Sequence, residues 1–237
     1  KIIAKSSGET LSEHTIACLR AAQVLVDSLP ISKKEKLNLG EEIFLAVALH
    51  DVGKAAKGFQ EVLYGKQKDW KGKRHEIISA SFASGIKGMP AATVFAILTH
   101  HKNIPTDGIT QIWGALPYEQ IPFEEETAVW KEMVSEWREN SSLFVEEWKK
   151  VCSYLNNLIA RNLFDEFQLK RLSLHPSWLE RGSGQRGQKR CISFADRYRA
   201  SIVRGITIAS DHLGSINKVP PKIPNLLNFQ VLKTEHN

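Results

Sequence analysis

Cysteine is scarce in this chain of 237 residues, where only Cys18, Cys152 and Cys191 occur, far apart and without a Cys-x-x-Cys pair. This scarcity argues against a disulfide framework and against a thiolate zinc site, and it fits a reducing compartment. No apolar run reaches the roughly 18 residues that a transmembrane helix needs, and no signal peptide is visible. We therefore expect a cytoplasmic protein with no membrane partner.

Aromatic residues are also few, at 8%, whereas 42% hydrophobic and 24% charged residues are ordinary values for a soluble globular protein. The net charge of +6 is unevenly placed, since the segment from Lys170 to Lys222 has eleven Lys or Arg against three acids. Such a segment suits either a nucleic-acid footprint or solvated helix faces. Its glycine-rich loop at 181–190 is too polar to pack, and Arg186, Lys189 and Arg190 are its candidate DNA contacts.

Apolar residues recur at helical spacing through most of the chain, and no segment shows convincing strand alternation. Helices are expected over residues 10–29, 41–50, 55–64, 75–86, 91–101, 123–139, 142–163 and 194–213, with a polar break at 30–38 and a loop-rich part at 102–121. The sequence predicts an all-α bundle that forms one globular domain over residues 1–217. The prolines within 218–237 predict a tail or a linker.

Seven histidine and aspartate side chains fall at the ends or on the inner faces of these apolar helices. Each alone has a simple structural explanation, for example as a satisfied core histidine, but seven on five helices point to a metal site. They are His14, His50, Asp51, His75, His100, His101 and Asp211. Five imidazoles and two carboxylates are too many for one ion that must keep a position open, so they suit two ions sharing a bridging carboxylate.

Two carboxylates against two divalent ions leave an excess of positive charge. This charge favours a phosphate group and lowers the pKa of a bound water toward neutrality. The chemistry implied is hydrolysis of a phosphate ester by metal-activated water. Mixed imidazole and carboxylate ligands accept manganese, iron, cobalt, nickel or zinc, with magnesium also permitted, and the residue types do not choose among them.

The order H…HD…H…HH…D resembles the HD phosphohydrolase superfamily and, more closely, the HD nuclease domain of the CRISPR-associated helicase–nuclease of type I systems. The similarity extends over residues 4–216. It rests on Gly8-Glu9-Thr10-Leu11-Ser12-Glu13-His14, on His50-Asp51-Val52-Gly53-Lys54, on His75 and His100-His101, and on Ser210-Asp211-His212-Leu213-Gly214-Ser215.

The resemblance implies an HD-domain helical bundle with two metal ions. The first ion would be held by His14, His50, Asp51 and Asp211, and the second by Asp51, His75, His100 and His101. Asp51 would bridge the ions, and Lys54 would contact the scissile phosphate or a leaving oxygen. Asp51 and Lys54 are therefore the candidate catalytic residues.

The resemblance further implies a single-stranded DNA nuclease, cutting internally or processively, in CRISPR antiviral interference. Its partners would be single-stranded DNA, a helicase domain or subunit, and an RNA-guided surveillance complex. No phosphate-binding loop and no helicase motif is visible, and the chain begins with Lys1 rather than Met. We therefore expect the nuclease part of a longer protein, with residues 218–237 leading toward a helicase domain, or else a separate subunit.

Two other interpretations stay open. An HD enzyme could act on nucleotides or cyclic dinucleotides, but the cyclic-dinucleotide branch carries a Gly-Tyr-Pro signature after its paired histidines. Here that segment is His101-Lys-Asn-Ile-Pro-Thr-Asp-Gly-Ile109, without the signature. A catalytically inactive HD docking module would be expected to have lost ligands, whereas all seven positions are filled.

Overall fold

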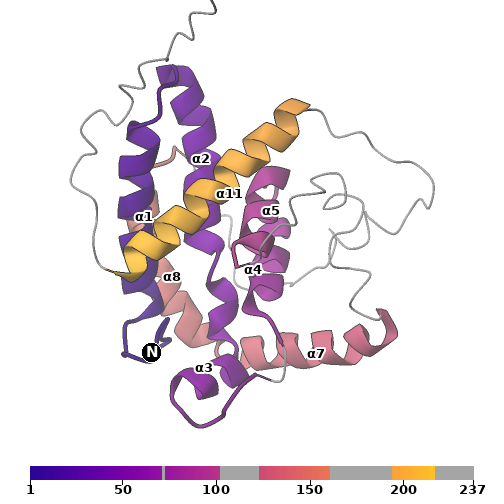
Figure 1. Cartoon of the computed structure of the whole chain (residues 1–237). Coiled ribbons are helices and arrows are strands. Elements are labelled where there is room, and N and C mark those ends of the chain that lie inside the picture. Colours follow the sequence, from indigo (N-terminus) through magenta and orange to yellow (C-terminus); the bar gives the residue numbers. More distant parts are fainter. Residues whose placement is uncertain (71–72, 102–122, 161–193, 217–237) are drawn as a thin grey trace, which may run out of the picture.

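The computed structural model describes residues 1–70, 73–101, 123–160 and 194–216, and these ranges are helical (Figure 1). The elements are α1 (Leu11–Asp27), α2 (Lys33–Leu49), the 3-10 helix η1 (Val52–Ala55), α3 (Lys57–Leu63), α4 (His75–Ser84), α5 (Ala91–Thr99), α7 (Phe123–Glu139), α8 (Ser141–Leu155) and α11 (Phe194–Ser215). Within the described ranges there is no strand, only an isolated bridge between Ile3 and Thr10. The all-α prediction is confirmed.

A capping box begins α1, as its sequence predicts. The Glu13 backbone N–H donates to the Thr10 hydroxyl at 3.2 Å, and the Thr10 N–H donates to the Glu13 carboxylate at 2.8 Å. The two bonds satisfy backbone donors that a helix start leaves unpaired. From this start, His14 and Cys18 follow one turn apart on the buried face of α1.

Two predicted helix bounds are wrong. The stretch at 30–38 is not a break throughout, because α2 begins at Lys33 behind a second capping box between Ser32 and Glu35. The first turns of α2 face solvent and are polar. They therefore show no apolar periodicity that would predict a helix. Helix α8 ends at Leu155 rather than near 163, with Asn156 as its C-cap and a turn after it.

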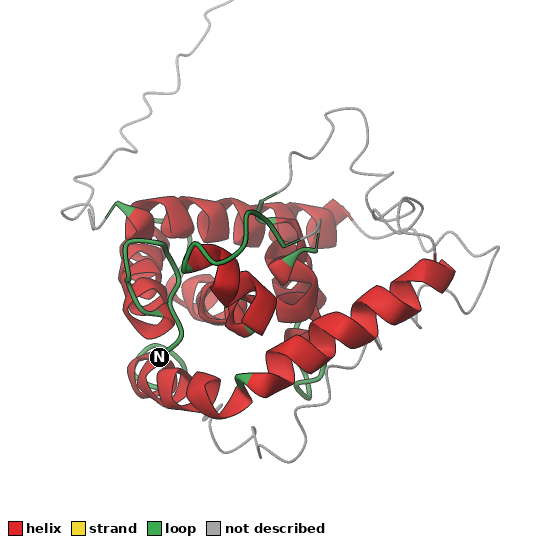
Figure 2. Ribbon diagram, turned by 90° about the horizontal axis from the view of Figure 1, so that it is seen from below, coloured by secondary structure: helices red, strands yellow, loops and turns green. Residues whose placement is uncertain are grey.

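Helix α11 crosses α1, α2 and α5 on one side of the bundle (Figure 1). Seen from below, α7 and α8 lie along the opposite side, with the helices of the first hundred residues between the two layers (Figure 2). The shared core is built from fully buried aliphatic residues, among them Leu19, Ile43, Leu45, Leu49 and Ile97. Residues far apart in sequence thus meet where α11 rests on the N-terminal helices.

Two glycines allow the close contacts that bring the functional residues together. A Cβ on Gly214 of α11 would lie 2.5 Å from the Cys18 Sγ and 2.8 Å from the Cys18 backbone nitrogen. A Cβ on Gly53 of η1 would lie 2.0 Å from the carbonyl oxygen of His75. The absent side chains therefore let α11 approach α1, and let η1 approach the start of α4.

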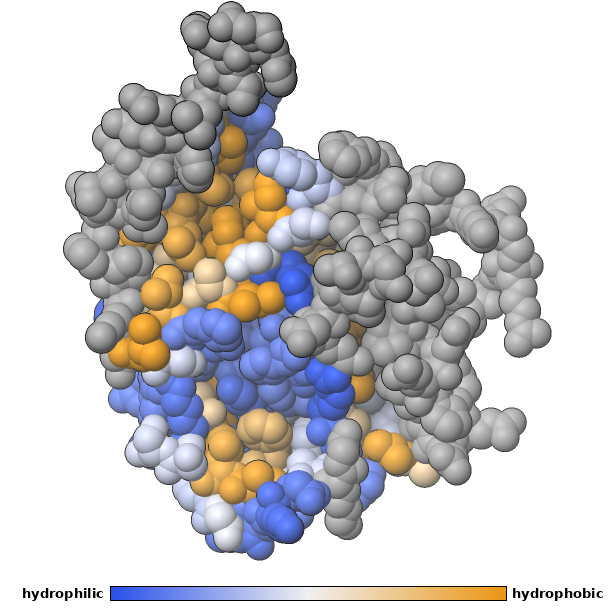
Figure 3. Space-filling model, viewed as in Figure 1, coloured by the Kyte–Doolittle hydropathy of each residue, from blue (hydrophilic) through white to orange (hydrophobic). Residues whose placement is uncertain are grey.

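The outer face of the described residues is mixed in character. A band of hydrophilic residues crosses the middle of the face in Figure 3, with apolar areas above and below it. None of the described helices combines the length and the apolar character needed to cross a bilayer.

Candidate metal centre

The structure brings all seven predicted ligand side chains together. His14 lies in α1, His50 is the C-cap of α2, Asp51 precedes η1, and His75 begins α4. His100 is the C-cap of α5 with His101 directly after it, and Asp211 comes from α11. Six of the seven are buried and His101 is exposed. Side chains from five helices and their ends therefore converge on one interior point, and His101 is the member of the set that is exposed.

The ligand atoms fall into two groups, within each of which they lie no more than 4.8 Å apart. One group consists of His14, Cys18, His50 and Asp211, and the other of Asp51, His75, His100 and His101. The second group is the set expected for the second ion. The first group differs from the expected set of His14, His50, Asp51 and Asp211, because it contains the sulfur of Cys18 and lacks Asp51.

Asp51 lies between the two groups. Its Oδ1 is 3.1 Å from the His75 Nε2, while its Oδ2 is 3.3 Å from the His14 Nε2 and 3.4 Å from the His50 Nε2. One carboxylate oxygen thus faces each group, which is the orientation that a bridging carboxylate needs. The carboxylate can therefore reach both proposed ions without turning.

Asp211 faces the first group from α11. Its Oδ1 lies 3.1 Å from the His14 Nε2 and 3.6 Å from the His50 Nε2. Ligands that bind one ion at about 2.1 Å are about 3.0 Å apart at octahedral angles and about 3.4 Å apart at tetrahedral ones. The distances in the first group thus match the spacing of ligands around a single ion.

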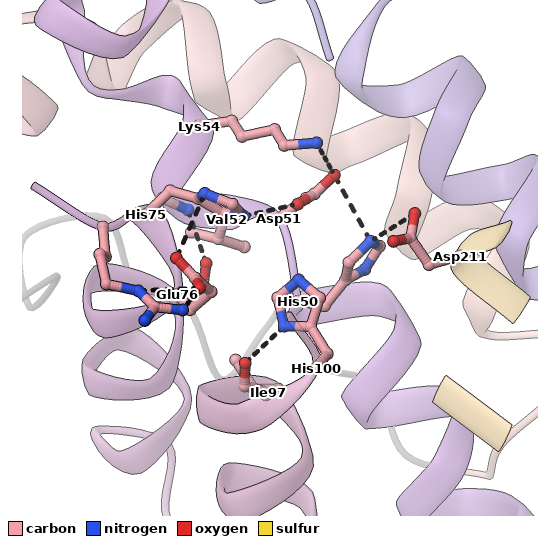
Figure 4. Close-up of polar contacts among 12 residues, drawn as sticks. His50, Asp51, Val52, Lys54, His75, Glu76, Ile97, His100 and Asp211 are labelled. Carbon is pink, nitrogen blue, oxygen red and sulfur yellow. Dashed lines mark hydrogen bonds and ion pairs between the residues drawn. The ribbon is translucent and has the colours of Figure 1, made fainter. Parts of the chain in front are cut away.

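Two of the histidines are held in the same way. The Nδ1 of His50 donates to the carbonyl oxygen of Val47 at 2.7 Å. The Nδ1 of His100 likewise donates to the carbonyl oxygen of Ile97 at 2.6 Å (Figure 4). Because a carbonyl only accepts, Nδ1 carries a proton in both rings, which leaves Nε2 as the ring atom that can bind an ion. Metal-ligating histidines are usually oriented by such a bond from the other ring nitrogen.

The buried Nε2 atoms of His50, His75 and His100 make no hydrogen bond. Buried polar atoms are almost always paired, so three such nitrogens around one carboxylate require an explanation. Divalent ions would supply it, since the Nε2 atoms of His50 and His75 lie 3.4 Å and 3.1 Å from the Asp51 carboxylate and His100 belongs to the same ligand group as Asp51. The donor set fits two divalent ions, although the assignment of each ligand stays a prediction.

Lys54 forms a close ion pair with Asp51. Its Nζ lies 2.6 Å from the Asp51 Oδ2, and its side chain is 13% exposed (Figure 4). Burial would lower the pKa of Lys54, but the Asp51 charge raises it, so the ammonium form is kept. Burial in turn favours a neutral Asp51, yet His50 and Lys54 hold its pKa well below the ordinary value.

The histidines differ in charge preference. Burial alone would lower the pKa of His14, but its contacts with Asp211 and Asp51 raise that pKa to about 11. Burial and the neighbouring His50 and His101 lower the pKa of His100 to about 3. Burial opposes ionisation of Asp211 as well, yet its contacts with His14 and His50 keep its pKa far below the usual range. A proton on His14 would therefore compete with a bound ion.

Two residues of the centre are not among the seven predicted ligands. Cys18 follows His14 by four residues, so the helical period alone places both on one face. Glu76 is buried beside its neighbour His75, with its Oε2 3.5 Å from the His75 Nδ1, and it is held by Arg74. The signal for Glu76 is only its adjacency to a ligand. Arg186, Lys189 and Arg190 lie outside the described residues.

Comparison with known proteins gives one match. The family model described as the HD domain matches residues 11–201, which include His14, the His50-Asp51 pair, His75 and His100-His101. Asp211 lies ten residues beyond the matched range, and it is the structure that places it in the centre. No curated protein and no solved structure matches the chain significantly.

Proposed function

The chain belongs to the HD domain family, whose members are metal-dependent phosphohydrolases, and we propose that it cleaves the phosphodiester bonds of single-stranded DNA. The observation that carries this proposal is the pair of ligand groups with Asp51 between them. Two bound divalent ions would neutralise phosphate charge and lower the pKa of a water ligand. This is the chemistry that a very stable phosphodiester requires.

The residues of the chain have distinct roles in this proposal. Asp51 would bind both ions, one through each carboxylate oxygen. His50 and His100 would bind through Nε2, because the Nδ1 of each ring donates to a backbone carbonyl. Lys54 now pairs with Asp51, and bound ions would take over that charge balance. Its Nζ would then be available to a phosphate oxygen or to the leaving oxygen, which makes Asp51 and Lys54 the proposed catalytic residues.

The substrate would approach from the side of His101, the exposed member of the centre. A polymeric, highly charged substrate is favoured by the net charge of +6 and by the basic segment that holds Arg186, Lys189 and Arg190. The resemblance of the ordered motifs to the type I CRISPR nuclease domain supports a role in antiviral interference. A helicase domain or subunit and an RNA-guided surveillance complex are the partners proposed on the same basis.

The test is cleavage of circular and linear single-stranded DNA in the presence of manganese, nickel or cobalt. Nucleotides and cyclic dinucleotides are incubated in parallel. We expect the circle to be opened, and we expect Asp51→Ala to abolish cleavage and to lower bound metal because both ligand groups lose a contact. Asp27→Ala, an exposed carboxylate at the end of α1, is the matched control and should cleave normally.

The alternatives give different outcomes. If both DNA forms stay intact while a nucleotide is consumed, the enzyme is a small-molecule phosphohydrolase and the nuclease proposal is wrong. If metal binds and no substrate is consumed, the chain is a docking module. If Asp51→Ala retains full metal content and activity, the bridging role of Asp51 is refuted.

A further inference from the structure

A buried sulfur atom lies against the first ligand group. Cys18 is fully buried in α1, and its Sγ lies 3.6 Å from the His14 Nε2 and 3.9 Å from the His14 Nδ1. We propose that the Cys18 sulfur is a ligand of the first ion, together with His14, His50 and Asp211. The inference deepens the proposed function, because it rests on an ion being bound at this centre.

The distances support direct ligation. A zinc-like ion binds imidazole nitrogen at about 2.0–2.1 Å and sulfur at about 2.3 Å, so the two atoms are about 3.6 Å apart at a tetrahedral angle. The Cys18 Sγ and the His14 Nε2 have this separation. The Asp211 Oδ1 completes the arrangement at 3.1 Å from His14 and 3.6 Å from His50, and all four ligand atoms lie within 4.8 Å of one another.

A second observation points to a ligand independently of the cysteine. The His50 side chain is 1% exposed, its Nδ1 is bound to the Val47 carbonyl, and its Nε2 makes no hydrogen bond. That bare nitrogen belongs to the same group as the Cys18 sulfur. A buried nitrogen without a hydrogen-bond partner is rare in proteins. An ion held between this nitrogen, the sulfur, the carboxylate oxygen and the second imidazole would supply the missing partner.

Sulfur ligation would make the two ions unequal. With the bridging Asp51, five side chains would surround the first ion with two nitrogens, two oxygens and one sulfur, and the sulfur favours zinc, cobalt or iron over manganese or magnesium. The second group has no sulfur and includes the exposed His101, so the open position for substrate would be there. On binding, the thiol releases its proton to solvent and the sulfur donates an electron pair to the ion.

Packing is the competing explanation for Cys18. The Cys18 sulfur lies beside Gly214, and a Cβ added to Gly214 would be 2.5 Å from that sulfur. A small side chain is therefore needed between α1 and α11. The conservative change Cys18→Ser keeps that size while it removes the soft ligand. Cys152 provides the control, because it is equally buried, in α8, and belongs to neither ligand group.

The experiment is an anaerobic titration of the chelator-treated full chain with cobalt(II), followed by visible and near-ultraviolet absorption. Ligand-field bands report that cobalt is bound, and a sulfur-to-cobalt charge-transfer band reports a thiolate ligand. We expect the unaltered chain to show both signals. Cys18→Ser should lose the charge-transfer band completely and lose at most one equivalent of cobalt, whereas Cys152→Ser should keep both signals.

The outcomes separate this inference from the proposed function. Ligand-field bands without a charge-transfer band in the unaltered chain would overturn Cys18 ligation, and this readout needs no variant to fold. A charge-transfer band that persists in Cys18→Ser would overturn it as well. A charge-transfer band that depends on Cys18, in a chain that cleaves no DNA, would support the ligand and refute the nuclease.

Discussion

Gly53→Ala tests whether the close approach of η1 to α4 holds the centre together. The added Cβ would lie 2.0 Å from the His75 carbonyl oxygen, 2.8 Å from its carbon and 3.0 Å from its Cα, all of them backbone atoms. Because the neighbour is backbone, no side-chain rotation relieves the contact. The two segments must separate by about 1 Å before the Cβ reaches the shortest tolerated distances.

That separation would act on Asp51 and His75 directly. Their 3.1 Å contact would open to about 4 Å, and the bond from the Gly53 N–H to the Ser79 hydroxyl at 2.8 Å would be strained. We expect a loss of about 2 kcal/mol in the free energy of unfolding, as in other overpacked sites. Activity should fall by about 100-fold, the usual consequence of a 1 Å misplacement.

The measurements are bound metal by elemental analysis, urea unfolding of the metal-free chain, and DNA cleavage. Gly205→Ala is the matched control, since Gly205 lies in α11 with nothing within 4 Å of its added Cβ. It should gain about 0.5–1 kcal/mol from helix propensity and keep its metal. If Gly53→Ala unfolds and binds metal like the unaltered chain, the reasoning about this contact is wrong.

Two further predictions concern pH and salt. His100 has a pKa of about 3 when folded against about 6.5 when unfolded, so the metal-free chain should lose stability as the pH falls from 6.5 toward 3. His14, at about 11, contributes stability below pH 6.5 that is lost as the pH rises toward 11, so the urea midpoint should be highest near pH 6.5. A midpoint that is constant from pH 4.5 to 9 would contradict both assignments. Replacing Arg186, Lys189 and Arg190 with Ala should weaken DNA affinity and reduce the dependence of log affinity on log salt by up to about 2, at about 0.7 per phosphate contact on a single strand, with metal content unchanged. An unaltered salt slope would mean that these residues do not contact DNA.

The helical fold and the convergence of the ligand side chains were accessible from sequence because both follow from local patterns. The apolar runs that end at His50 and at His100 predict helices whose ends reach one interior point, and the structure has both ends there. The start of α2 was missed even though Ser32 and Glu35 have capping-box spacing, because its first turns are polar. Apolar periodicity detects buried faces and not solvent-exposed turns.

The finer geometry of the centre is only partly visible in such local patterns. No second cysteine accompanies Cys18, so a search for paired cysteines does not find it, whereas its position one helical turn from His14 brings it to the centre. The approach of α11 to α1 depends on Gly214, and a glycine at a tight interhelical contact looks in sequence like any other helical glycine. Interhelical distances of this kind are set by packing over the whole bundle.

The direction of the helices at the centre has an electrostatic consequence. Helices α2 and α5 present their C-terminal ends through His50 and His100, and each such end carries about half a negative charge. Helix α4 presents its N-terminal end at His75, whose ring lies 5.2 Å from that of the exposed His101. The backbone field would therefore attract cations on the α2 and α5 side and an anion on the α4 side. A bound phosphate would be drawn toward the start of α4, so the orientation of a DNA strand would be set partly by backbone dipoles, independently of which ions are bound.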